Sequence, residues 1–174
     1  MSKVHIISDE HYYHSNILMW ENNRGKRPFK SVDHMNRTMI QRHNEVVAKE
    51  DTVYHLGDFT FSKNYKEMVS IMGKLNGTHI LILGNHDLMK PFDYIEMGFQ
   101  SVHTSLQLEH FILIHDPAVA GVVKDKIFIH GHTHGLGKFL GDNTYCVCVE
   151  LHDYYPVDME QIKRELYEPK RREV

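Results

Sequence analysis

The chain has 174 residues, of which 41% are hydrophobic and 25% are charged, and its formal net charge is −3. These values are ordinary for a globular protein, and we expect residues 1–174 to form one domain with a full hydrophobic core. The slightly acidic balance argues against a protein that wraps duplex nucleic acid. The chain also carries 15 histidines, several times the usual share, which favours metal or proton chemistry.

Cysteine usage and hydropathy exclude two further classes of protein. Cys146 and Cys148 lie two apart in a strand-like run, where they are poorly placed to bridge each other, so we expect no disulfide framework. Nowhere do about 18 apolar residues follow one another, and residues 1–3 lead into a strand without a signal-peptide core. We therefore expect a cytoplasmic protein without a membrane segment. The basic groups at residues 24–27 and 170–172 are expected to be solvated charge.

Four apolar runs in the chain end in polar residues that suit metal binding. The runs cover residues 4–8, 52–56, 79–83 and 126–130, and the polar residues after them are Asp9 and His11, then Asp58, then Asn85, His86 and Asp87, and finally His132 and His134. Such a run is typical of a strand that delivers side chains to the carboxyl end of a sheet. Because open α/β sheets bind ligands at that edge, the pattern predicts an α/β fold with a metal site there.

Amphipathic segments between and after these runs predict helices at residues 17–20, 31–47, 65–75 and 159–167. Ser15 or Asn16 would cap the first of them. His14, just before that cap, is either a substrate contact or a structural residue. The polar segment at residues 21–30 is interpreted as a surface loop, either a connector or a lid over a site.

The second half of the chain adds three segments to this pattern. Residues 111–114 predict a strand that delivers His115, and residues 145–151 predict the final strand. Residues 88–106 are mixed in character and predict loops with one short helix or strand.

His132 and His134 form the strongest local metal signal in the chain. They lie two apart between glycines at the end of a buried strand, and satisfied core histidines seldom come in such pairs. His130 points to the other side of that strand and is expected to pack or to support the ligands.

The candidate ligands share oxygen and nitrogen donors and include no thiolate: Asp9, His11, Asp58, Asn85, His115, His132 and His134. Seven such ligands are too many for one tetrahedral zinc, but they suit two cations that share one carboxylate. Asp58 is the side chain best suited to that bridge. The donor set favours manganese, iron, nickel or zinc over magnesium or calcium and does not distinguish among these four. Manganese is our first expectation.

The combined order of these blocks, from Asp9 to His134, resembles the five-block signature of calcineurin-like metallophosphoesterases. Each block alone is a weak signal, whereas the full pattern is highly specific and spans nearly the whole chain. The first block continues as His14-Ser15-Asn16-Ile17, which is similar to the small, cap-less, single-domain branch found in bacteria and phages.

This resemblance implies a fold and a set of residue roles. The fold would be a four-layer α/β/β/α sandwich in which two mixed sheets pack between helices. One metal would be held by Asp9, His11, Asp58 and His134, and the other by Asp58, Asn85, His115 and His132. The resemblance also implies that His86 stays unligated near the leaving group. From the chemistry we expect His86 to act as a general acid steadied by Asp87, and we expect His14 and Asn16 to contact the substrate.

The chemistry expected of such a site is phosphoester hydrolysis. Two cations reduce the repulsion between an anionic ester and a hydroxide that bridges them, and His86 would donate a proton to the departing alkoxide. A small phosphodiester, such as a nucleotide or cyclic nucleotide, is the preferred substrate. A phosphomonoesterase is the alternative within enzymes, and a non-catalytic scaffold is the alternative outside them, although this chain keeps His86 and every ligand position.

Overall fold

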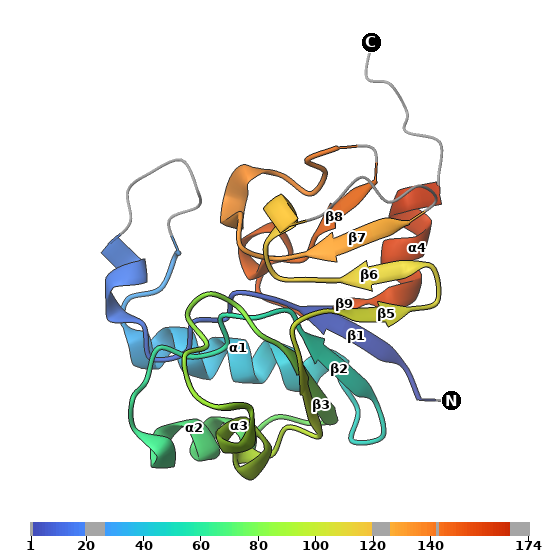
Figure 1. Ribbon diagram of the computed structural model, residues 1–174. Coiled ribbons are helices and arrows are strands. Elements are labelled where there is room, and N and C mark those ends of the chain that lie inside the picture. Colours follow the sequence, from blue (N-terminus) through green and yellow to red (C-terminus); the bar gives the residue numbers. More distant parts are fainter. Residues whose placement is uncertain (1, 20–26, 120–125, 142, 168–174) are drawn as a thin grey trace.

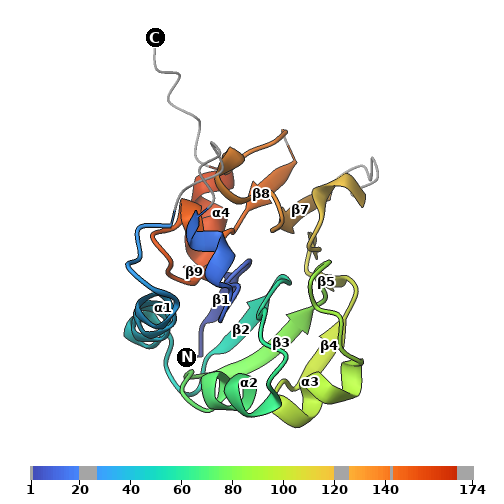
Figure 2. The ribbon, with the colours of Figure 1, turned by 90° about the vertical axis from the view of Figure 1, so that its left-hand side faces the viewer.

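The computed structural model of the chain describes residues 2–19, 27–119, 126–141 and 143–167 (Figure 1). Two mixed β-sheets lie next to each other and are flanked by helices, which confirms the expected α/β sandwich (Figures 1 and 2). The basic tail at residues 170–172 lies outside the described residues, as do residues 20–26, which include most of the expected surface loop.

The first sheet has the strand order β4-β3-β2-β1-β9. In chain order its strands are β1 (Val4–Ile7), β2 (Thr52–His55), β3 (Thr78–Ile82), β4 (Ser101–His103) and β9 (Val157–Asp158). Strands β1 to β4 run parallel, and β9 pairs antiparallel with β1. The carboxyl ends of β1, β2 and β3 therefore meet at one edge, as the sequence predicts.

The second sheet has the strand order β5-β6-β7-β8. Its strands are β5 (Leu106–Leu108), β6 (Phe111–Leu113), β7 (Ile127–His130) and β8 (Thr144–Cys146). Strands β6, β7 and β8 run parallel, whereas β5 forms a hairpin with β6. This sheet also directs the carboxyl ends of two neighbouring strands, β6 and β7, to one edge.

Four α-helices in the described residues complete the fold: α1 (Val32–Val46), α2 (Tyr65–Met72), α3 (Pro91–Met97) and α4 (Met159–Tyr167). Ser31 caps α1 as expected, since its side chain accepts a hydrogen bond from the backbone N–H of His34 at 3.1 Å. The helix predicted at residues 65–75 is shorter, because Gly73 ends it and the next two residues make i→i+3 bonds. Short 3₁₀ turns occur at η1 (Ser15–Met19), η2 (Pro117–Val119), η3 (His134–Leu136) and η4 (Val149–Leu151).

Strand alternation divides the apolar side chains between two cores. Ile7 and Leu81 belong to the core that α1, α2 and α3 cover on one side of the first sheet (Figure 2). Their chain neighbours Ile6 and Ile82 point the other way, into the core shared with the second sheet and α4. The first sheet is thus buried on both faces, which explains why neighbouring residues of β1 and β3 are apolar on both sides of the strand.

Two predicted segments differ from the structure. Residues 88–106 contain α3, β4 and the start of β5, which is more regular structure than the mixed sequence indicates. The strand predicted at residues 145–151 stops at Cys146, because the chain then crosses from one sheet to the other. Cys148 bridges to Ser8 of the first sheet, and Val149 donates to the Ser8 carbonyl at 3.2 Å.

In the part of the chain that the structure describes, none of the helices has the length and apolar character needed to cross a bilayer.

Candidate metal centre

The seven candidate ligands gather where the strands of both sheets end. Asp9 and His11 follow β1, Asp58 follows β2, and Asn85 follows β3 in the first sheet. The second sheet contributes His115 after β6, and His132 and His134 after β7. The site therefore lies at the junction of the two sheets.

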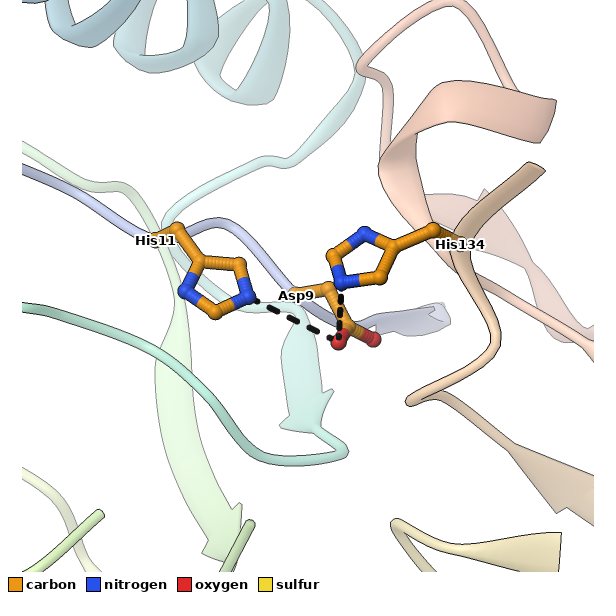
Figure 3. A group of neighbouring side chains, drawn as sticks. All are labelled: Asp9, His11 and His134. Atoms are coloured by element: carbon orange, nitrogen blue, oxygen red, sulfur yellow. Dashed lines mark ion pairs between the residues drawn. The ribbon is translucent and has the colours of Figure 1, made fainter. Parts of the chain in front are cut away.

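Asp9 uses its two carboxylate oxygens differently. Oδ2 accepts hydrogen bonds from the Ser8 hydroxyl at 2.5 Å, the His132 backbone N–H at 2.8 Å and the Cys148 thiol at 3.2 Å. Oδ1 faces the Nε2 atoms of His134 at 3.7 Å and His11 at 3.8 Å, as Figure 3 shows. These two separations are too long for hydrogen bonds and short enough for one cation to bind all three atoms.

Unpartnered buried atoms show that the first group suits a cation. Among the described residues, Asp9 Oδ1 and both ring nitrogens of His11 are buried without a hydrogen-bond partner. Burying a polar atom without a partner costs free energy, so such atoms normally bind another group. A divalent cation among Asp9, His11 and His134 would satisfy one oxygen and one imidazole nitrogen that the protein leaves bare.

The two carboxylate oxygens of Asp58 also have different partners. Its Oδ1 accepts the backbone N–H of His86 at 2.8 Å, whereas its Oδ2 lies 3.6 Å from His11 Nε2 and 3.6 Å from His115 Nε2. Asp9, Asp58 and His115 form a second group whose ligand atoms could hold a cation. Oδ2 of Asp58 thus faces imidazoles of both groups, the position that a bridging carboxylate requires.

Asn85 and His132 extend the second group. Asn85 Oδ1 lies 3.0 Å from His115 Nε2 and 2.9 Å from His132 Nδ1, and these two nitrogens are 3.2 Å apart. An amide oxygen and two imidazole nitrogens therefore converge next to Asp58, in agreement with the donor set expected for a second metal.

Backbone strain is concentrated at the same residues. Nine described non-glycine residues have positive φ, and five of them are candidate ligands: Asp9 (60°), His11 (51°), Asp58 (56°), His132 (69°) and His134 (49°). Each such conformation costs about 1–3 kcal/mol and persists only where the surroundings enforce it. The left-handed residues turn the chain sharply after each strand, so that side chains two apart aim at one centre.

Two glycines are needed for close approach at the centre. A Cβ on Gly131 would lie 1.8 Å from Ser8 Oγ and 2.5 Å from Asp9 Oδ2. A Cβ on Gly84 would lie 2.3 Å from Asp58 Oδ1. Both glycines precede candidate ligands in the sequence, and they allow the loop of one strand to pass directly against a carboxylate of another.

Hydrogen bonds donated by Nδ1–H orient two of the imidazoles. His115 Nδ1–H donates to the Leu56 carbonyl at 2.7 Å, which leaves Nε2 unprotonated and directed at Asp58. His134 Nδ1–H donates to Glu150 Oε1 at 3.0 Å, which directs its Nε2 at Asp9 in the same way. The sequence analysis did not identify Glu150, because it lies in a segment predicted to be an ordinary strand.

Arg27 corrects the expectation that the basic segment at residues 24–27 is solvated. Its side chain is fully buried, donates to Glu150 Oε1 at 2.9 and 2.8 Å, and donates to the backbone carbonyls of Glu10 at 2.7 Å and Asp9 at 2.5 Å. The ion pair compensates the burial of the guanidinium. Arg27 therefore holds both Glu150 and the loop of the first ligands, a role that no local sequence signal indicates.

Asp87 has different partners from the expected ones. Its carboxylate accepts backbone N–H groups of Asp58 at 2.7 Å, Phe59 at 3.2 Å and Gly84 at 2.8 Å. It therefore ties together the loops after β2 and β3, which position Asp58 and His86, whereas we expected it to steady the His86 ring. Burial raises the pKa of Asp87 to about 6.

His86 stands apart from the buried imidazoles. Its side chain is 39% exposed, and its Nε2 lies 4.0 Å from Asp58 Oδ2. The exposed fraction for the side chain of His11 is 1%, and for that of His115 it is 4%. His86 is thus more accessible to a molecule arriving from solvent than His11 or His115, which suits a residue that exchanges protons.

At Asp9 and His11 the pKa shifts favour the protonation states that bind metals. Burial alone would raise the pKa of Asp9, but His134, His115 and His11 together lower it to about 2. Burial lowers the pKa of His11 well below its usual value, so that its ring is neutral near pH 7. Burial raises the pKa of Asp58, and the neighbouring His115 opposes that change. An ionised carboxylate and a neutral imidazole are the forms that coordinate a cation.

His14 and Asn16 lie at different depths beside the centre. The His14 ring stacks on Phe61 with centroids 3.8 Å apart and lies 5.3 Å from the His11 ring. Burial lowers the pKa of His14 to about 4. Asn16 is exposed on η1. The substrate contacts expected of both residues stay predictions.

The cysteines are free, as expected, and both are buried. Cys148 supports the centre through its hydrogen bond to Asp9, and its sulfur lies 3.2 Å from that of Cys146. His130 Nδ1–H donates to the Gly131 carbonyl at 2.8 Å, so His130 supports the backbone just before His132.

Two solved structures that superpose on this chain share its fold. The protein of unknown function AQ665 from Aquifex aeolicus superposes with a TM-score of 0.70 at 24% identity, over 95% of this chain and 100% of that one. The nuclease MPE from Pseudomonas putida superposes with a TM-score of 0.50 at 20% identity, over 74% of this chain and 60% of that one.

Sequence comparison identifies relatives of this chain. No family model matches the chain. Gene 66 protein of Mycobacterium phage L5 is 28% identical over 168 residues, covering 77% of this chain and 78% of the phage protein. The uncharacterized protein MJ1445 of Methanocaldococcus jannaschii is 37% identical over 172 residues, covering 93% of this chain and 90% of MJ1445. At that identity and coverage, the chain belongs to the protein family of MJ1445.

Proposed function

We propose that this protein is a metal-dependent phosphoesterase that hydrolyses small phosphodiesters, such as nucleotides or cyclic nucleotides. The observation that carries the proposal is the position of Asp58, whose Oδ2 faces imidazole nitrogens of two groups at 3.6 Å each. A carboxylate shared in this way suits two cations a few ångströms apart, the arrangement used for in-line displacement at phosphorus. The likeness of the fold to a nuclease supports the same reaction class.

The ligands divide into two sets in this proposal. Asp9, His11, Asp58 and His134 would hold one cation, and Asp58, Asn85, His115 and His132 would hold the other. Two transition-metal ions held there, manganese being preferred, would supply Lewis acidity to the phosphoryl oxygens and would lower the pKa of a water molecule to about 7.

The remaining steps belong to side chains of the protein. His86, which solvent can reach and which lies 4.0 Å from Asp58 Oδ2, donates a proton to the leaving oxygen. Asp87 keeps the loops of Asp58 and His86 in register through its three backbone hydrogen bonds. Glu150 and Arg27 hold His134 and the Asp9 loop in their binding geometry.

The test is hydrolysis of bis-p-nitrophenyl phosphate against p-nitrophenyl phosphate, with protein stripped of metal and reloaded with Mn, Ni, Zn or Mg. We expect diester turnover that requires a transition metal and falls by about 10²–10⁴-fold in His86→Asn, which should keep its metals. The matched control is His110→Asn, because His110 lies in the β5–β6 turn at the opposite end of β6 from His115.

Each outcome separates the candidate functions. Faster turnover of the monoester would make the protein a phosphomonoesterase. The absence of any turnover in protein that holds two metals would contradict the enzymatic proposal and favour a scaffold. Normal turnover in metal-loaded His86→Asn would remove His86 from the mechanism.

A further inference from the structure

An apolar pocket opens next to His86. It has a volume of about 230 Å³, and its walls include Phe61, Lys63, Leu88, Met89 and Tyr94 in addition to His86. These residues come from the loop that follows β2, from the segment between β3 and α3, and from α3, which carries Tyr94. The walls are mostly apolar, although the metal centre beside them is highly polar.

Two of the wall residues are apolar side chains that the fold does not bury. Leu88 is 86% exposed although it directly follows Asp87, and Phe61 is 39% exposed. An isolated exposed leucine needs no explanation, but an exposed leucine and phenylalanine around one pocket mark a binding surface.

Phe61 is held rigidly for this position. Its ring stacks on His14 with an interplanar angle of 8° and lies 4.8 Å from the His86 ring, measured between centroids. Its backbone N–H donates to the Tyr12 carbonyl at 2.8 Å, which fixes the loop against the chain that follows β1. One face of the Phe61 ring is thus packed by His14 and the wall is preorganised, which lowers the entropic cost of binding a ligand.

The place of the pocket relative to His86 identifies what it binds. In the proposed reaction His86 protonates the leaving oxygen, so a pocket that includes the His86 ring receives the group attached to that oxygen. The pocket is smaller than the roughly 300–1,000 Å³ typical of sites for drug-sized ligands, and it therefore suits a single ring system. Aromatic walls favour a planar, stacking group, and bases stack on such side chains irrespective of sequence.

We propose, on the basis of the phosphodiesterase function above, that this pocket binds a planar aromatic group on the leaving side of the phosphodiester. Lys63, exposed at the rim, offers a cation to a polar substituent or phosphate of that group. A nucleobase and a simple aryl group share this chemistry, and the experiment separates them.

The experiment measures binding of leaving alcohols without any turnover, by saturation-transfer NMR on the zinc-loaded protein, since zinc is diamagnetic. Adenosine carries a nucleobase, p-nitrobenzyl alcohol carries an aryl group, and cyclohexylmethanol is an apolar control that is not planar. We expect the planar alcohols to bind more tightly than cyclohexylmethanol. Binding of adenosine alone would identify the nucleobase as the ligand, and binding of the aryl alcohol alone would identify the aryl group.

Leu88→Ser is the decisive variant, because Leu88 is so exposed that its replacement leaves the fold intact. We expect it to weaken binding of the planar alcohols on the order of ten-fold, the scale of one lost stacking or apolar wall. Val46→Ser is the matched control, since Val46 is 40% exposed at the end of α1, which leads to the amino end of β2. It should not change binding.

The proposal is overturned if cyclohexylmethanol binds as tightly as the planar alcohols, or if Leu88→Ser leaves their binding unchanged. The same variant should raise the KM for bis-p-nitrophenyl phosphate more than it lowers kcat. Planar alcohols that bind in the pocket of a protein that hydrolyses no phosphodiester would contradict the proposed function instead, so the two failures are distinguishable.

Discussion

Two buried clusters of histidine and carboxylate side chains serve different purposes in this protein. The strand-end cluster comprises Asp9, His11, Asp58, His115 and His134, and the sheet cluster comprises Glu10, His43, His55 and His79. In the strand-end cluster, imidazole nitrogens face carboxylate oxygens at 3.6–3.8 Å. In the sheet cluster, His55 bonds to Glu10 at 2.5 Å and to His79 at 3.0 Å.

The difference teaches that convergence of three donors separates a metal site from a buried polar network. In the sheet cluster the two ring nitrogens of His55 bond to different partners, so the donors form a chain and do not surround one point. In the strand-end cluster, each of two groups brings three ligand atoms within 4.8 Å of one another, as one cation requires. Burial lowers the pKa of His43, His55 and His79 to about 3 each, so these three imidazoles are uncharged near neutral pH.

The largest expected effect comes from Asp58→Asn, which removes the charge shared by both ligand sets. We expect metal content to fall and activity to drop below that of His86→Asn, whose own loss is about 10²–10⁴-fold. Elemental analysis beside the diester assay measures both effects. A variant that retains two metals would contradict the bridging role of Asp58.

His55→Ala should separate the sheet cluster from metal binding. We expect a loss of roughly 2–5 kcal/mol in the free energy of unfolding, because the variant opens a cavity and leaves the buried carboxyl of Glu10 without its partner. Metal content per folded chain should stay the same as in the wild type. Urea unfolding measures the change in stability, and elemental analysis measures the metal content. Loss of metal from the folded variant would show that the sheet cluster contributes to metal binding.

Glu150→Gln tests the support of the strand-end cluster. The amide keeps the size of the side chain but weakens its bonds to His134 and Arg27, and supporting partners of this kind are worth about 10–100-fold in metal affinity. A competition titration with a chelator would measure that loss. An unchanged dissociation constant would show that His134 needs no partner at Nδ1.

The smallest expected effect is a change in the pH dependence of stability in His43→Gln, measured on metal-free protein. The folded-state pKa of His43 is about 3 and its ordinary value is 6.5, so the unfolded chain binds more protons between these pH values. The free energy of unfolding therefore falls on acidification through this window, by about 1.4 kcal/mol per pH unit for each such histidine.

Glutamine can keep the bond from His43 to the Asn76 carbonyl, which is 2.9 Å long, but it does not titrate. The variant should lose the contribution of one histidine to that slope, which urea unfolding between about pH 4 and 6 would reveal. Equal slopes in the two proteins would contradict the assignment of a neutral, buried His43.

Local patterns in the sequence determined the strand ends and the order of the candidate ligands. The apolar runs before Asp9, Asp58, Asn85 and His132 form β1, β2, β3 and β7, and parallel pairing brings the ends of β1, β2 and β3 to one edge of the first sheet. Helices α1 and α4 follow their predicted bounds because capping and 3.6-residue periodicity are local signals.

Only the tertiary structure decided the partners of those residues. Arg27 and Glu150 meet across 123 positions, and the Asp87 carboxylate turned out to bind the backbone of the loop after β2. The sheet cluster, the two-residue strand β9 and the pocket beside His86 likewise join segments far apart in the chain. A single sequence carries residue types and local periodicity, whereas these features depend on which distant segments pack together, and that is settled by the folded core as a whole.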